Sequence, residues 1–379
     1  MQAAPVDLSD RRLKQIDRAR QLVIAEGHGL PAPGLGPQRG WSERSWRRCL
    51  EGGRRPEQRL EFDSVSASSI RANAECHHTL LQTARPVLAA LSRAIARTRY
   101  FAILTDAEGI VLDVALGAGH DDRRIRAIAR VGVNLSEPGI GTSAISAALT
   151  ELHPVWLHRG EHFFADTNVY SCAGAPVFGP DGRCLGMIDL TGVLADERPE
   201  LMHLAAQAAR CVENALTRQR PHALCVRLSW PGQAQGGDQE GLICLDNDGW
   251  IVGANQAARQ MIPDLSGLSA EALHANALFA VSHAVLFERA RLRELSETGP
   301  LEVPLWSGLC AQVLPETNVW GAKRSAPVAS LNPLSLRQYE AALVRHALRD
   351  AQGNVMQAAR ALGISRATLY RKLGHKPSP

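Results

Sequence analysis

The sequence has no C-x-x-C pair, although it contains eight cysteines in 379 residues. Scattered cysteines without that spacing argue against a structural zinc site and against a disulfide framework. The chain also lacks a long apolar run and an N-terminal secretory pattern, so we expect a cytoplasmic protein with reduced thiols and no membrane partner. No G-x-x-x-x-G-K-[ST] motif is present, which excludes the usual phosphate loop. With no Ser-His-Asp or paired-carboxylate signature, we expect no enzyme activity.

Aromatic residues are scarce at 5%, so the cores should be built from Ala, Leu, Ile and Val. The hydrophobic share of 45% and the charged share of 21% are typical of globular domains, and the length predicts two or three of them. The net charge of +4 is unevenly placed. From Pro333 onward eight basic residues face two acidic ones, so the C-terminal segment carries the positive charge that phosphate contacts require.

That basic segment has the pattern of two short helices. Val355, Ala359 and Leu362 lie at helical spacing, Gly363 allows a tight turn, and Ser365 can cap a second helix. The whole pattern is similar to a Fis-type helix-turn-helix, whose second helix would enter a major groove. The resemblance and the basic face indicate these DNA-binding candidates: Asn354, Ser365, Arg366, Thr368, Tyr370, Arg371 and Lys372. The alternative is a basic helix that is merely solvated.

Within that set the positions suggest different roles. Arg366 and Thr368 lie in the first turn of the second helix, where side chains reach base edges. Arg371 and Lys372 lie one turn later and should meet phosphates, and Asn354 should clamp a flanking phosphate.

The front half predicts an α+β domain preceded by helices. We expect two N-terminal helices, the second around Trp41–Leu50 with its tryptophans packed on the next domain, and a long helix from Ile70 to Arg97. Strands are predicted at 101–105, 110–115, 172–178 and 184–191, with a helix opening at Ser143 and another at 199–218. The long helix could serve as a dimerisation stalk.

Several separated blocks of this half resemble a known sensor. They are Ser45–Gly53, Pro138–Ser143, Glu161–Phe163, Cys172–Gly182 and Gly186–Gly192. Together they resemble the GAF sensor half of acetoin-catabolism-type activators, which implies a small-molecule effector. Most such activators carry a central ATPase that acts on sigma-54 polymerase, and this chain has neither its phosphate loop nor its Gly-Ala-Phe-Thr-Gly-Ala loop. We therefore expect regulation by DNA occupancy, by recruitment (with RNA polymerase as a candidate partner) or by antagonism.

Between these two parts, a hairpin at 242–254 that runs into a helix with Asn255 at its start resembles the opening of a PAS domain. The stretches 221–237 and 315–333 are interpreted as linkers. The predicted organisation is an N-terminal helical segment (1–69), a GAF-like α/β sensor (70–220), a PAS-like α/β domain (221–314), a linker (315–332) and an all-α Fis-type helix-turn-helix (333–379). The fold class is therefore α+β multidomain.

Candidate ligand-binding residues lie in the histidine-rich stretch of the GAF-like part: Trp156, His162, Phe163 and Cys172. His153, His158, Glu161 and Asp166 lie close to them in sequence, so three interpretations stay open. These residues could line an organic-ligand pocket, hold a metal or haem, or be structural. We predict no cofactor, with metal or haem in this domain left open. Cys172 and Cys184 should lie on neighbouring strands, where oxidant sensing is a further alternative.

These features predict a one-component, sequence-specific transcriptional regulator that binds double-stranded DNA as a homodimer and responds to a small metabolite. Two other hypotheses are a redox-, metal- or haem-dependent sensor regulator and an architectural DNA-binding protein.

Overall fold

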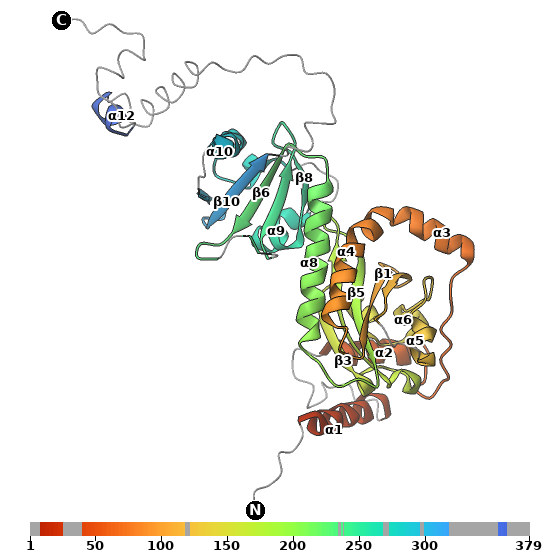
Figure 1. Cartoon of the computed structure of the whole chain (residues 1–379). Coiled ribbons are helices and arrows are strands. Elements are labelled where there is room, and N and C mark those ends of the chain that lie inside the picture. The colour runs from red at the N-terminus through yellow and green to blue at the C-terminus, as the bar shows by residue number, and fades with distance from the viewer. Residues whose placement is uncertain are drawn as a thin grey trace, which may run out of the picture. The chain divides into compact units, whose positions relative to one another are not determined.

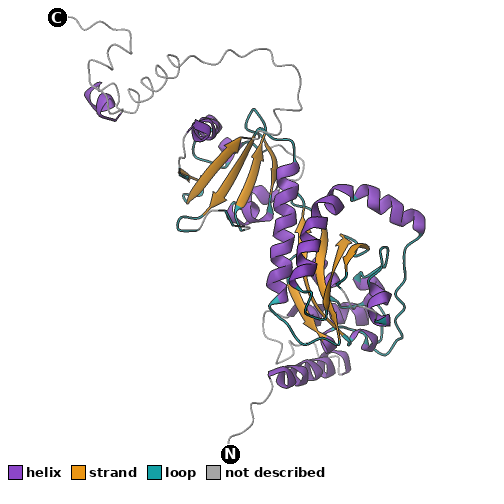
Figure 2. Cartoon of the chain, in the orientation of Figure 1, coloured by secondary structure: helices purple, strands orange, loops and turns teal. Residues whose placement is uncertain are grey.

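The computed structural model describes residues 8–25, 40–117, 122–233, 236–237, 239–267, 273–295, 299–317 and 355–361. The chain divides into two compact units, Met1–Ala322 and Lys323–Pro379. Both sheets belong to the first unit (Figures 1 and 2). The fold is α+β, with two five-stranded antiparallel sheets.

The first sheet has the strand order β2-β1-β5-β4-β3. Its strands are β1 (Tyr100–Asp106), β2 (Val111–Ala115), β3 (Val155–His158), β4 (Tyr170–Phe178) and β5 (Cys184–Val193). The two predicted hairpins are confirmed. Asp106 accepts the backbone N–H groups of Glu108 and Ile110 and so closes the β1–β2 turn. β3 was not predicted.

Helices cover one face of this sheet. α4 (His78–Ala94) and α8 (Leu201–Gln219) run beside each other along it (Figure 1), and their apolar sides join Leu104, Ile188 and Leu190 in one buried cluster. The predicted long helix is in fact two helices, because α3 (Ala67–Cys76) ends at His77 and α4 starts directly after it. The predicted closing helix is confirmed as α8.

The other face carries a second buried cluster, which contains Phe101, Ile103, Met187 and Cys172. Three short helices cover it: α5 (Arg123–Ile128), α6 (Glu137–Ile140) and α7 (Ala144–Glu151). α7 begins directly after Ser143, as predicted, and Ser143 caps it in a reciprocal capping box with Ser146.

The N-terminal helices pack against this domain. They are α1 (Leu8–Arg20), its π-helical continuation η1 (Gln21–Ala25) and α2 (Gly40–Glu51). Trp46 is fully buried beside Ile16 and Phe163, and its indole N–H donates to the carbonyl of Glu161 at 2.9 Å. Trp41 is 5% exposed. The prediction that the tryptophans anchor α2 on the domain is therefore confirmed.

The second sheet has the order β8-β7-β6-β10-β9. Its strands are β6 (Leu224–Ser229), β7 (Gly241–Leu245), β8 (Ile251–Ala254), β9 (Leu301–Pro304) and β10 (Cys310–Thr317), with α9 (Gln256–Met261) and α10 (His283–Leu295) on one side. The predicted β7–β8 hairpin and the helix that starts at Asn255 are confirmed. The Asn255 side chain caps α9 by accepting the N–H of Ala258.

Two predicted linkers need correction. The stretch 221–237 contains β6, the central strand of the second sheet, because Leu224, Val226 and Leu228 are fully buried in its core. The second linker was placed from Pro315, but Pro315, Glu316 and Thr317 belong to β10 and pair with β6.

In the second unit the structure describes α12 (Val355–Ala361), in agreement with the first predicted helix of the helix-turn-helix. Ala359 on it is buried. Across the described part of the chain, no helix combines the length and apolarity needed to span a bilayer.

Candidate functional site

A small pocket lies on the face of the first sheet that α5, α6 and α7 cover. Its apolar lining is Phe62, Ile103, Ile128, Leu135, Ile140, Ala144 and Ile145, and its polar lining is Ser143, His162, Thr167, Tyr170, Cys172, Asp189 and Thr191. The free volume is about 20 Å³, enough for one water molecule. A larger ligand enters only if lining side chains move apart.

Asp189 is the distinctive polar group of this pocket. It lies on β5 opposite Gly174 of β4, in the strand register that also brings Ala173 opposite Leu190. The Thr191 hydroxyl donates to its Oδ2, whereas the buried Oδ1 has no hydrogen-bond partner. Burial raises the pKa of Asp189 to about 7 against the opposing effect of the Thr191 hydrogen bond. A buried oxygen without a partner is costly, so this atom is a ready acceptor or donor for a ligand.

His162 and Cys172 meet at the same pocket, with 3.5 Å between His162 Nε2 and Cys172 Sγ. His162 Nδ1 lies 2.9 Å from the Arg159 carbonyl oxygen, and it must donate there, which leaves Nε2 as the acceptor. Burial lowers the pKa of His162 to about 4. Burial also raises the pKa of Cys172 well above its usual value. Both groups are therefore neutral near pH 7, and the pair is a hydrogen bond between a thiol and an imidazole.

The structure does not bring Trp156 and Phe163 to this pocket. Trp156 precedes Leu157, the residue paired with Cys172, and therefore points to the opposite face of the sheet. It lines a separate, wide hollow of about 850 Å³ together with Trp41 and Arg44. Phe163 is fully buried beside Trp46 and Ile16, so it supports the N-terminal helices.

The other polar residues of the histidine-rich stretch have separate partners. His158 Nδ1 shares a hydrogen bond with Ser171, Glu161 pairs with Arg12 at 2.6 Å, and Asp166 accepts the backbone N–H of Leu60. These groups do not converge on one point. Within the part of the chain that the structure describes, the group of three side chains suited to a metal is His222, Cys225 and Cys244, which the sequence analysis did not select. The available signal was an H-x-x-C spacing rather than C-x-x-C.

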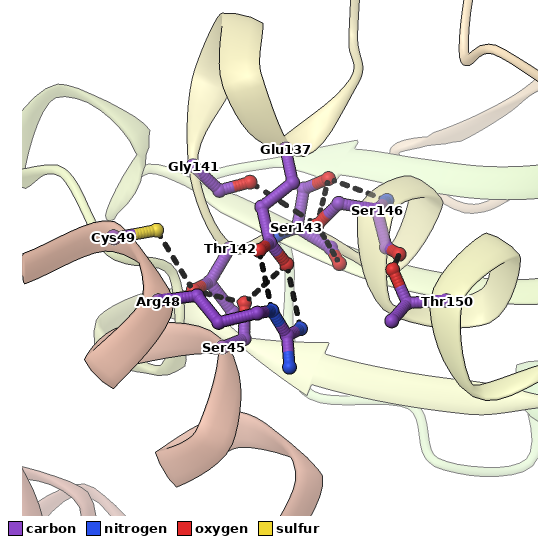
Figure 3. Close-up of polar contacts among 9 residues, drawn as sticks. All are labelled: Ser45, Arg48, Cys49, Glu137, Gly141, Thr142, Ser143, Ser146 and Thr150. Atoms are coloured by element: carbon purple, nitrogen blue, oxygen red, sulfur yellow. Dashed lines mark hydrogen bonds and ion pairs between the residues drawn. The ribbon is translucent and has the colours of Figure 1, made fainter. Parts of the chain in front are cut away.

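α2 contacts α6 and the turn after it, the segment that supplies Ile140 and Ser143 to the pocket lining. Figure 3 shows the polar contacts of this segment. Arg48 of α2 donates to both carboxylate oxygens of Glu137, at 2.7 and 2.8 Å. Ser45 donates to the same carboxylate at 2.8 Å and lies 2.7 Å from the Thr142 hydroxyl. These contacts connect α2 to the start of α6 and to Thr142 in the turn after it.

α1 holds a second part of the pocket wall, the loop that carries His162. The Arg20 guanidinium donates to the carbonyl oxygens of Gly160 at 2.8 Å, of Phe163 at 3.0 Å and of His162. Arg12 adds the ion pair with Glu161. Both parts of the pocket wall are therefore held by helices that precede the sheet in sequence.

The predicted DNA-binding residues lie outside the described residues: Asn354, Ser365, Arg366, Thr368, Tyr370, Arg371 and Lys372. Their assignment remains a prediction from the sequence.

Two known families match the chain, one in its N-terminal half and one at its C-terminal end. Residues 41–214 match the family described as MimR, N-terminal domain, and residues 335–374 match the family of Bacterial regulatory protein, Fis family. The first match covers the pocket, the sheet and α2, and the second covers α12 and the predicted recognition helix.

Curated relatives match a little over half of the chain. The chain is 29% identical to the acetoin catabolism regulatory protein of Cupriavidus necator over 227 residues, which are 58% of this chain and 34% of the relative. It is 28% identical to the acetoin dehydrogenase operon transcriptional activator AcoR of Bacillus subtilis, over 59% of this chain and 37% of AcoR. The aligned region thus spans about a third of these relatives.

Among solved structures, the N-terminal part of DhaR in the E. coli DhaR(N)–DhaL complex aligns with 16% identity and a TM-score of 0.45, over 73% of this chain and 99% of that chain.

The matches define a chain that joins a sensor-type N-terminal domain to a helix-turn-helix. The sensor domain is MimR/AcoR-like and the helix-turn-helix is of the Fis family. Residues 215–334 between them hold the second sheet and no phosphate-loop motif, and they leave no room for an ATPase module.

Proposed function

We propose that this chain is a DNA-binding transcriptional regulator whose N-terminal domain binds a small neutral effector in the pocket beside Asp189. The observation that carries the proposal is the unpartnered Oδ1 of Asp189 in an otherwise largely apolar pocket. Such a site combines burial of an apolar body with one or two orienting polar contacts, as small-molecule sites do.

The pocket chemistry favours a compact ligand with a hydroxyl or carbonyl group. Asp189 accepts from a hydroxyl when ionised and donates to a carbonyl when protonated, and its pKa of about 7 allows both. The neutral His162 and Cys172 provide no charge to bind an anion. The relatives that act in acetoin catabolism point in the same direction, since their named metabolite is a hydroxyketone. We assign the effector class as neutral alcohols, ketones or hydroxyketones of three or four carbons.

The response passes from the pocket to the rest of the chain along β5 and α8. Asp189 faces the pocket, whereas its neighbours Ile188 and Leu190 face the cluster that α8 covers. A ligand that displaces β5 therefore displaces the packing of α8. At its far end α8 contacts β7 through the Thr217 carbonyl, which accepts from Cys244 at 3.4 Å.

We further propose that residues 70–220 form a GAF-like sensor and that a PAS-like domain runs from 221 to the end of β10 at Thr317. A homodimer would place two helix-turn-helix units on a two-fold operator. Without an ATPase, DNA occupancy itself is the output, either by recruiting or blocking RNA polymerase or by antagonising another regulator.

The redox alternative finds less support in the pocket. A reactive cysteine needs thiolate character, and burial keeps Cys172 protonated.

Calorimetric titration of the full chain with acetoin, butan-2-one and propan-2-ol tests the pocket. We expect at least one compound to bind, and Asp189→Asn to weaken that binding about 10- to 100-fold, the value of a hydrogen bond to a charged group. Asp181→Asn, an exposed carboxyl before the same strand, is the matched control. Equal affinity in the parent and Asp189→Asn would remove the pocket from the proposal.

A further inference from the structure

A second polar cluster lies where α8 meets the second sheet. Cys225 of β6 and Cys244 of β7 are direct partners in the strand register. Both are buried, on the face of the sheet away from its main core, beside Leu242 and Val252. The Cys244 thiol reaches the Thr217 carbonyl at the end of α8. Two sulfur atoms therefore lie in a buried layer between a helix of the first domain and a strand of the second.

His222 completes the cluster from the segment that connects the two. It lies three residues before Cys225, and its ring is half-buried. His222 Nδ1 lies 2.6 Å from the Arg220 carbonyl oxygen and donates to it, so Nε2 carries the lone pair. A histidine that ligates a metal is usually held in this way, with its second ring nitrogen donating to a carbonyl.

We propose that His222, Cys225 and Cys244 bind one Zn²⁺ ion at the joint between the two sheets of the first unit. One imidazole and two thiolates are a soft donor set that suits zinc, and three protein ligands leave a fourth position for water or the Thr217 carbonyl oxygen.

The distances between the three ligand atoms allow tetrahedral zinc binding after small movements. The ligand atoms all lie within 4.8 Å of one another. Zinc–sulfur bonds of about 2.3 Å and zinc–nitrogen bonds of about 2.0 Å at tetrahedral angles require ligand separations of about 3.5–3.8 Å. The atoms must therefore close by up to about 1 Å. The half-buried His222 ring can supply most of this movement, because the two cysteines are fixed by the strand pairing.

Cysteine binds zinc as the thiolate, so binding of the ion by Cys225 and Cys244 releases protons, and zinc affinity should increase with pH.

A bound zinc would fasten the end of α8 to the second sheet. Cys244 supplies a ligand from β7 and Cys225 supplies one from β6. His222 supplies the third ligand from the short segment between α8 and β6. Metal occupancy would thus stiffen the connection through which the proposed effector signal passes. The site itself does not depend on the identity of the effector.

The rival for these residues is a cross-strand disulfide, since directly opposed residues of antiparallel strands lie about 4.5–5.5 Å apart at Cα, within disulfide range. In the structure both thiols are free. A disulfide would remove both zinc thiolates, so the two outcomes exclude each other.

The test uses the full chain, purified under reducing conditions and dialysed against excess Zn²⁺ and then against metal-free buffer. We expect about one zinc per chain by elemental analysis, and a Co²⁺-loaded form with thiolate-to-metal absorption. His222→Ala and Cys225→Ser should each weaken zinc binding by more than about 100-fold. Loss of a residue that only supports a ligand costs at most roughly that much. Cys310→Ser, at an exposed cysteine, and His203→Ala are matched controls.

Because His222 is half-buried, its variant should fold even where a substitution of the fully buried Cys244 fails. Zinc retained equally by His222→Ala and Cys225→Ser overturns the proposal. So does a reduced chain that takes up no zinc, or a Cys225–Cys244 disulfide that persists under the reducing conditions that keep the other cysteines as thiols.

Discussion

Replacing Asp189 by Asn should remove a loss of folding stability that the parent protein shows as the pH rises from acid to alkaline values. The Asp189 carboxyl is buried and one oxygen has no partner, so its pKa is raised from 3.8 to about 7. Between pH 4 and pH 7 the unfolded chain has lost this proton while the folded chain keeps it, and folding stability therefore declines as the pH rises. Asn has the same shape and no ionisation, so the variant lacks this decline.

The magnitude follows from the size of the shift. About 1.4 kcal/mol corresponds to each pH unit of difference, so the parent should lose about 3 kcal/mol relative to Asp189→Asn between pH 5 and pH 8. That corresponds to a relative change in Tm on the order of 5–10 °C for a domain of this size. Any cost of the amide itself is the same at both pH values and cancels in the comparison.

Urea unfolding of both proteins at pH 5 and pH 8, followed by tryptophan fluorescence, measures this difference. Asp181→Asn, whose carboxyl is exposed, should track the parent at both pH values. The reasoning about the pocket is refuted if Asp189→Asn and the parent change equally between pH 5 and pH 8.

Further predictions concern the N-terminal helices and the DNA-binding segment. Trp46→Ala should cost about 3–5 kcal/mol in unfolding free energy, because it empties a fully buried site, whereas Trp306→Ala, 67% exposed, should change it by less than about 0.5 kcal/mol. Arg48→Met should cost about 1 kcal/mol by the same urea assay, since its ion pair with Glu137 is partly exposed; no change would show that α2 does not depend on this pair. In gel shifts, Arg366→Ala should cost about 1–3 kcal/mol and relax sequence preference, whereas Lys372→Ala should weaken binding to all sequences alike; parent-like binding by both variants would contradict the helix-turn-helix assignment.

Most of the secondary structure of the first domain could be predicted from local sequence patterns. The β1–β2 and β4–β5 hairpins and the helix starts at Ser143 and Asn255 depend on residues close in sequence, so they could be predicted. β6 could not, because Pro221 before it and the glycine-rich stretch after it resemble a linker, while its burial depends on β10, far along the chain. β3 is only four residues long and has no alternating pattern to identify it.

The candidate site was predicted only in part, because some of its residues come together only through contacts that are distant in sequence. His162 and Cys172 were both named as candidate ligand-binding residues, and the structure brings them within hydrogen-bond distance of each other. Their binding of a ligand stays a prediction. Trp156 was selected with them, but a shift of one residue along β3 turns its side chain to the other face of the sheet. Asp189 was missed, because its burial and its unpartnered oxygen depend on the tertiary packing around β5, which the local sequence does not reveal.

The central claim, that an effector in the sensor pocket controls DNA occupancy, is tested most directly by genome-wide binding of the full chain in cells grown with and without acetoin and related alcohols and ketones. We predict a small set of discrete sites whose occupancy changes with one of these compounds in the parent and does not change in Asp189→Asn. Uniform binding along the genome that ignores every compound would contradict the account and favour an architectural DNA-binding protein.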